Sequence, residues 1–190
     1  MAGGFGRGRR SIRGGAFLLA PSLVMLLAAA ADPGRAALVA ELAAARGPSQ
    51  AAQLEGELES LRQHAVQPTV RLLLRRAQRE SSGGDHRDAV SDLGDALLLQ
   101  PDSALLWRER AAVRAEAGDL DGAIGDLGGA LARDPNDVLT WTALSQVEGA
   151  RGSWKAALKA WSHVLTLDPM LPGGAAQGDR LRRHAFGQPA

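Results

Sequence analysis

Residues 118–135 read GDLDGAIGDLGGALARDP, and the same pattern recurs once before and once after them at a constant spacing. The preceding copy is GDHRDAVSDLGDALLLQP at 84–101, and the following copy is GSWKAALKAWSHVLTLDP at 152–169. The copies are 34 residues apart, as the prolines at 101, 135 and 169 show. Self-similarity at a fixed period of this length is typical of units that stack on one another. The sequence therefore predicts an array in which each unit buries its apolar face against a neighbour.

Each feature of the pattern has a physical reason. The glycine that opens each copy suits the left-handed residue that ends a helix, because glycine adopts that conformation without a steric penalty. The Asp or Ser that follows can cap the next helix, and the closing proline cannot continue it. Columns of small residues let paired helices approach closely. The small-residue columns are Ala89, Ala123 and Ala157, then Ala96, Ala130 and Val164, then Ala77, Ala111 and Ser145.

These residues resemble the tetratricopeptide repeat (TPR) family. The likeness runs from about Val70 to Pro169, over half of the chain. It rests on a large residue followed four positions later by a small one, then G-[DS]-x-x-x-A-[IVL], then A-L-x-x-x-P. The large-small pairs are Leu73 with Ala77, Trp107 with Ala111, and Trp141 with Ser145. The third copy departs at its end, where Val164-Leu165 precedes Pro169, and the family's later aromatic is replaced by Glu80, Arg114 and Glu148.

The resemblance implies an all-α fold, an α-solenoid of three TPR helix pairs with flanking helices. An N-terminal signal or transmembrane helix is expected from the sequence of residues 7–31. We expect helix pairs at 70–82 with 85–99, 103–117 with 119–132, and 137–151 with 153–167. The expected organisation is a signal or anchor at 1–31, a helical spacer at 32–68, three repeats at 69–169, and a C-terminal capping helix with a tail at 170–190. The capping helix is expected at 175–186.

The middle copy contains a weak helix. Gly122, Gly125, Gly128 and Gly129 all fall in its second predicted helix. An interior glycine costs about 1 kcal/mol relative to alanine. We therefore expect this helix to depend on contacts with its neighbours.

In the TPR family the first helix of each pair lines a concave surface that commonly binds an extended peptide or a partner helix. The resemblance assigns this surface to Arg71, Leu74, Gln78, Leu105, Arg108, Leu139, Thr142 and Gln146. Arg71 and Arg108 are placed where they can hold one carboxylate by charge-assisted hydrogen bonds, and the alternative is that both are solvated surface arginines. Some relatives clamp a chaperone's terminal carboxylates with Lys and Asn. Gln78, Ala112 and Gln146 stand where those Asn residues are expected, so that activity is not implied.

The N-terminus has the pattern of an export signal. Arg7, Arg9, Arg10 and Arg13 precede an uncharged stretch, AFLLAPSLVMLLAAAA at 16–31, and Asp32-Pro33-Gly34 breaks it. Sixteen helical residues span about 24 Å, short of the roughly 30 Å hydrocarbon core. The three alanines before Asp32 fit a cleavage site, so a cleaved signal and a retained anchor both remain open. We expect a bacterial TPR protein in the inner membrane facing the periplasm, or periplasmic if the signal is cleaved. An RNA-binding tract is the less favoured interpretation of the arginines.

Residues 32–68 predict two helices separated by Gly47-Pro48, the second capped by Ser49. Leu54, Leu58, Leu61 and Ala65 form one apolar stripe on that second helix. The stripe either packs on the repeats as a lid or forms a dimerisation seam. The second interpretation makes the protein a self-associating structural spacer and a possible homo-oligomer.

Composition excludes several function classes. The chain of 190 residues has no Cys, no Tyr and only 4% aromatic residues, with a net charge of +1. The absence of Cys excludes disulfides and thiolate chemistry, and the four His form no metal-ligand motif. The repeat region carries a small acidic excess, which disfavours a phosphate backbone. We expect no enzyme activity, no cofactor, no metal and no nucleic acid. The expected function is an adaptor or scaffold at the bacterial cell envelope, with a protein or peptide partner and membrane contact through the N-terminal segment.

Overall fold

The computed structural model describes Met1 and residues 32–187. The predicted signal or anchor at 1–31 therefore lies outside the described residues, apart from Met1. Among the helices that are described, none is long and apolar enough to span a bilayer. Residues from Asp32 onward form one compact unit.

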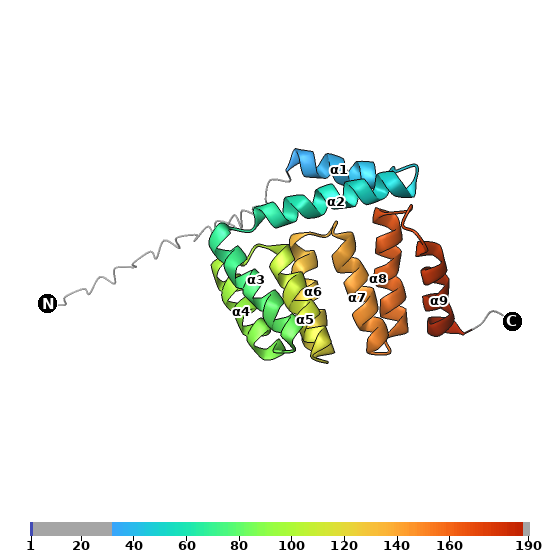
Figure 1. The fold of residues 1–190 in the computed structure, drawn as a ribbon. Helices are drawn as coiled ribbons and strands as arrows, with labels where there is room; N and C mark the ends of the chain where they lie inside the picture. The colour runs from blue at the N-terminus through green and yellow to red at the C-terminus, as the bar shows by residue number, and fades with distance from the viewer. Residues whose placement is uncertain (2–31, 188–190) are drawn as a thin grey trace. The chain divides into compact units, whose positions relative to one another are not determined.

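This unit is all-α, with no strand in the described part of the chain, as predicted. The helices are α1 (Pro33–Ala43), α2 (Pro48–Ala65), α3 (Pro68–Gly83), α4 (His86–Leu99), α5 (Ala104–Glu116), α6 (Leu120–Arg133), α7 (Val138–Ala150), α8 (Trp154–Leu167) and α9 (Gly174–Phe186). From α3 to α9 the bounds fall within two residues of the predicted ranges. The hairpins α3–α4, α5–α6 and α7–α8 stand side by side, with α9 against α8 (Figure 1).

The turn inside each hairpin depends on glycine. Gly84, Gly118 and Gly152 have φ of 88°, 82° and 82°, a conformation that other residues rarely adopt. The backbone amide after each glycine donates to the helix that is ending, as Asp119 does to Arg114 at 2.8 Å. The predicted caps are only partly right: the Asp119 side chain accepts from the Gly122 amide, but Asp85 and Ser153 make no such bond.

The two tryptophans at equivalent repeat positions, Trp107 and Trp141, make equivalent hydrogen bonds. The Trp107 indole donates to the Pro101 carbonyl at 3.0 Å, and the Trp141 indole donates to the Pro135 carbonyl at 2.8 Å. Each bond ties the start of a hairpin to the loop that precedes it. Trp161 is buried, and its indole donates to the Gly174 carbonyl at 2.8 Å, which fixes the start of α9. The repeat therefore reproduces side-chain contacts as well as helix positions.

The segment predicted as a spacer belongs to the packed body. Helices α1 and α2 lie across the ends of the three repeat hairpins and do not extend the row that the hairpins form (Figure 1). Leu54 and Leu58 are buried with Val138, Trp161 and Leu181, so the lid interpretation describes this structure. Because Leu54 and Leu58 are buried within the chain, they are not available to form a dimerisation seam. Leu61, the third leucine of the stripe, is 41% exposed.

The predicted Ser49 cap is wrong. Gly47 is the N-cap, and Pro48 occupies the first turn of α2. Proline is suited to that position because it lacks the amide hydrogen that a helix start leaves unpaired. Ser49 therefore lies inside the helix.

The glycines of α6 divide into two kinds, which predicts opposite effects of alanine. A Cβ at Gly125 or Gly128 would meet nothing within 4 Å, whereas one at Gly129 would lie 2.8 Å from Cε3 of Trp107. We expect Gly125→Ala and Gly128→Ala each to raise the free energy of unfolding by up to about 1 kcal/mol. Gly129→Ala should lower it, because the Trp107 ring must move. Urea unfolding of the full chain measures all three, and destabilisation by Gly128→Ala would contradict this account of α6.

Candidate functional site

A hollow of about 250 Å³ lies between the first helices of the first two hairpins, α3 and α5. Its lining residues are Gln63, Arg71, Leu74, Arg75, Gln78, Leu105 and Glu109. Four of the predicted surface residues therefore meet here, namely Arg71, Leu74, Gln78 and Leu105. The hollow is the strongest candidate for a binding site on this face.

Helical periodicity explains how α3 builds its side of the hollow. Arg71, Leu74, Arg75 and Gln78 follow one another at intervals of three, one and three residues, which places them on one face. Leu74 is buried and Leu105 of α5 is buried as well, so the hollow has apolar surface. Gln78 and Arg75 are exposed, and Arg71 is half-buried.

The charged side chains that line the hollow differ in whether they have a partner within the described part of the chain. Arg71 and Arg75 make no ion pair with any residue in the described part of the chain. The one carboxylate in the lining, Glu109, accepts a hydrogen bond from Gln78 at 3.1 Å. Two arginines without a partner beside apolar surface can bind a carboxylate and bury an adjacent apolar side chain.

Arg108 has a different role from the one predicted. It is buried, and its guanidinium donates to Glu59 at 2.6 Å and to Asp137 at 2.7 Å. Burial by itself lowers the pKa of Arg108, but Asp137 and Glu59 outweigh burial and raise that pKa above its ordinary value. The expected sharing of one ligand carboxylate with Arg71 is not the arrangement in this structure, because the partners of Arg108 are carboxylates of the chain itself.

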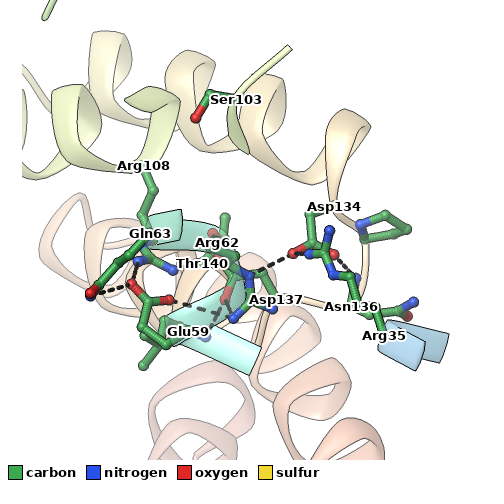
Figure 2. A network of polar contacts seen from close by, with 12 residues as sticks. Arg35, Glu59, Arg62, Gln63, Ser103, Arg108, Asp134, Asn136, Asp137 and Thr140 are labelled. Atoms are coloured by element: carbon green, nitrogen blue, oxygen red, sulfur yellow. Dashed lines mark hydrogen bonds and ion pairs between the residues drawn. The ribbon is translucent and has the colours of Figure 1, made fainter. Parts of the chain in front are cut away.

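Arg108 is part of a polar network that holds α1 and α2 on the array. Arg62 of α2 donates to Asp134 at 2.8 Å and lies 3.4 Å from Asp137, and Arg35 of α1 also pairs with Asp134. We call this network the clasp; its members are Arg35, Glu59, Arg62, Arg108, Asp134 and Asp137 (Figure 2). The clasp contains three arginines and three carboxylates, so its charges balance.

The three surface residues predicted on the third hairpin lie outside the hollow. Leu139 is 44% exposed at the start of α7, Thr142 is half-buried and Gln146 is exposed. None of the three lines the hollow. Their role in binding a partner stays a prediction.

Three lining residues were missed at the sequence level: Gln63, Arg75 and Glu109. Helical periodicity could have predicted Arg75 as a lining residue, because it follows Arg71 by four residues and lies on the same helical face. Gln63 could not be predicted in this way, because it belongs to α2 and reaches the hollow only when α2 docks on the array.

The His and acidic residues of the described part of the chain are dispersed. No group of three or more His or acidic residues in the described part of the chain is placed to hold a metal ion. The His side chains have other contacts: His163 stacks on Trp141 and His184 stacks on Trp154, with ring centroids 4.0 Å and 4.3 Å apart.

Comparison with known proteins establishes the fold. No protein-family profile and no curated protein matches the chain. Among solved structures it is similar to the first TPR domain of Spaghetti (RPAP3) bound to the HSP90 peptide SRMEEVD, at 16% identity and a TM-score of 0.56, over 60% of this chain and 90% of that one. It is also similar to the TPR2B domain of yeast Sti1 in its pHsp70 complex, at 24% identity and a TM-score of 0.51, over 62% and 99%.

A bacterial structure gives the same result. The Yersinia enterocolitica type III secretion chaperone SycD, in complex with a peptide of the translocator YopD, matches at 16% identity and a TM-score of 0.54, over 63% of this chain and 91% of that one. The fold of the described region is therefore that of TPR domains. At these identities the likeness carries the fold and no residue role.

Arg108 is buried in the clasp, whereas Arg71 makes no ion pair in the described part of the chain. Substitution of the two arginines should therefore affect stability differently. Arg108→Met should lower the free energy of unfolding by about 3 kcal/mol, because buried Asp137 and half-buried Glu59 lose their close pairs with Arg108 and keep only Arg62, at 3.4 Å and 3.5 Å. Arg71→Met should change it by less than about 0.5 kcal/mol, since no ion pair is lost. Urea unfolding of the full chain compares them. Equal losses would contradict the assignment of Arg108 to the clasp and of Arg71 to a free surface.

Proposed function

We propose that this protein is a non-catalytic adaptor that binds an acidic segment of a partner protein in the hollow between α3 and α5. One observation carries the proposal: Arg71 and Arg75 lack ion-pair partners in the described region and stand beside the buried leucines Leu74 and Leu105. A partner that supplies carboxylates to the arginines and an apolar side chain to the leucines satisfies both features.

The solved neighbours support peptide binding by analogy. Three of them are described as complexes with a peptide or chaperone segment, and the HSP90 peptide SRMEEVD contains three acidic residues. This chain has Gln78, Ala112 and Gln146 where carboxylate-clamping relatives are expected to have Asn. The proposed ligand is therefore an acidic segment in general, not the chaperone terminus in particular.

The same proposal places the adaptor at a bacterial cell envelope. Its support is the sequence of residues 7–31, a basic head followed by an uncharged apolar stretch. In this proposal the N-terminal segment inserts in the inner membrane or is cleaved, and the TPR unit acts in the periplasm. A self-associating spacer is less well supported, because Leu54 and Leu58 are already buried within the chain.

Binding by the hollow predicts a specific loss of affinity. Fluorescence anisotropy with a labelled peptide of alternating Glu and Leu, on the full chain, should show saturable binding that weakens as salt rises. Arg71→Gln combined with Arg75→Gln should weaken it at least tenfold, because each lost charge-assisted hydrogen bond is worth about 1.5–3 kcal/mol. Arg79→Gln is the matched control, since Arg79 is an exposed arginine of α3 outside the hollow. Affinity that is the same in the natural protein, the double variant and the control would overturn the proposal.

The envelope location has its own test. A reporter enzyme that is active only outside the cytoplasm, fused after the C-terminus, should be active with the natural N-terminus. Replacing Arg7, Arg9, Arg10 and Arg13 by Glu should abolish its activity, because the basic head orients the segment. The mass of the protein recovered from the cells distinguishes cleavage before Asp32 from a retained anchor. Activity that persists after the charge reversal would argue against export by this segment.

A further inference from the structure

The row of hairpins has an uncovered face at its start. Leu72 of α3, Leu106 of α5 and Thr140 of α7 are equivalent residues of the repeat. Leu106 and Thr140 are fully buried, whereas Leu72 is 60% exposed. The arginine four residues later differs in the same way, because the side chain of Arg76 is 57% exposed and that of Arg110 is 16% exposed. Helix α4 packs on α5 and α6 packs on α7, but no described second helix precedes α3, so this face of α3 is uncovered (Figure 1).

In the second hairpin, a buried acid on the equivalent face is bound by two arginines. Arg110 donates to both oxygens of Asp126, at 2.8 Å and 2.6 Å. Nη1 of Arg114 lies 2.9 Å from one of the same oxygens. All three residues belong to α5 and α6, so the second hairpin satisfies this carboxylate by itself.

The first hairpin lacks the second arginine. Asp92 and Arg76 are the equivalents of the acid and of its first arginine, but Glu80 stands at the place of Arg114. Nε of Arg76 donates its one hydrogen to Glu80 at 3.0 Å, and it lies 2.6 Å from Asp92 as a charge. One oxygen of Asp92 and one of Glu80 are buried and accept no hydrogen bond from the described residues. A further cationic donor would satisfy both oxygens.

The rest of this face adds negative charge. Asp88 and Asp95 lie about one turn before and after Asp92 on α4, and both are exposed. We call this surface the open face; its members are Leu72, Arg76, Arg79, Glu80, Asp88, Asp92 and Asp95. Its carboxylates outnumber its arginines by four to two. No three of the acids in the described part of the chain are placed to hold a metal ion, so the donor that fits is a basic side chain.

The other end of the row presents basic side chains. Helix α9 buries Gly174, Gly178 and Leu181. Arg180 and Arg183 follow two of these residues by two positions, which places them about 200° around the helix, on its outer face. Both arginines are exposed, and neither pairs with a described acid, since the Asp179 carboxylate is bound by Arg182. Phe186, at the end of the same helix, is 68% exposed.

We propose that copies of this chain associate head to tail, with the outer face of α9 of one copy against the open face of the next. Arg180 or Arg183 of one copy then supplies to Asp92 and Glu80 the guanidinium that Arg114 supplies within the second hairpin. The contact joins surfaces of opposite charge, and each of them also offers one exposed large apolar side chain, Leu72 or Phe186. The two surfaces lie at opposite ends of the row (Figure 1), so every added copy leaves a free end and association continues beyond a dimer.

This association is separate from the other surfaces of the molecule. It does not use the leucine stripe of α2, and the open face shares no residue with the lining of the hollow. It therefore does not depend on which ligand the hollow binds. Symmetric pairing of two open faces is disfavoured, because it would bring two surfaces with excess negative charge together.

Sedimentation velocity of the full chain tests the association. The mean sedimentation coefficient should rise with protein concentration without a limit at the dimer, and it should fall as salt is added. Replacing Arg180 and Arg183 together by Gln should weaken association at least about tenfold, because charge-assisted hydrogen bonds are lost. The control replaces Glu57 and Lys159 by Gln, since both are exposed and belong to neither surface. It should associate like the natural protein.

Glu80→Arg tests the open face without removing a stabilising contact. It gives the first hairpin the residue that the second hairpin has at this position, so Asp92 gains a partner from its own chain. The free energy of unfolding, measured in urea, should be no lower than that of the natural protein. Association should weaken at least about tenfold, because Asp92 is already satisfied and the introduced cation repels the arginines of α9.

Mixing the two variants distinguishes head-to-tail from symmetric association. Glu80→Arg retains the outer face of α9, and the variant without Arg180 and Arg183 retains the open face. Each variant alone should stay monomeric at concentrations at which the natural protein associates. An equal mixture should form dimers and nothing larger. A mixture that stays monomeric contradicts the head-to-tail arrangement.

Three further results refute the proposal. The first is a natural chain that remains monomeric at millimolar concentration. The second is association that Glu80→Arg leaves unchanged, which would assign it to another surface such as the apolar residues 16–31. The third is association that survives the loss of Arg180 and Arg183 but is abolished when the arginines of the N-terminal segment are replaced by Gln. Those arginines are Arg7, Arg9, Arg10 and Arg13.

Discussion

The arrangement of this molecule depends on one buried carboxylate, Asp137. Its side chain caps α7 by accepting from the Leu139 amide at 3.1 Å and also accepts from the Thr140 hydroxyl. The same group binds Arg108 of α5 and lies against Arg62 of α2. A fully buried charge requires such partners, because water is not available to solvate it. Asp137 therefore joins α5 of the second hairpin, α7 of the third hairpin and α2 at a single point.

Docking of α2 at this point determines what is left for a ligand. Arg71 and Arg108 both belong to first helices of the repeat, and the family resemblance assigns both to the same surface. Glu59 and Asp137 bury and neutralise Arg108, whereas α2 contributes only neutral Gln63 near Arg71. Docking of α2 thus places Arg108 in the protein interior and leaves the hollow beside Arg71 and Arg75.

A repeating scaffold also allows the same place to carry different chemistry. Gln100 and Asp134 lie at equivalent positions at the ends of α4 and α6, yet Gln100 donates to the Ala65 carbonyl of α2 and Asp134 accepts from Arg62 of α2. The backbone geometry is shared because the small columns are shared: Ala89, Ala123 and Ala157 are all fully buried. Functional differences along the array are therefore set by side chains at its edge, with no change in how the hairpins stack.

The sequence by itself determined the hairpins, their turns at Gly84, Gly118 and Gly152, and their bounds, because these follow from local conformational preference and from a pattern repeated at a fixed interval. It also placed Arg71, Leu74, Gln78 and Leu105 on one surface by family resemblance. Tertiary structure alone decided that α2 lies across the array, that Arg108 is internal, and that Gln63 reaches the hollow. The physical reason is that the contacts of the clasp join residues as far apart as Arg62 and Asp134. Local periodicity cannot encode such pairs, because only the docking of α2 on the array brings these residues together.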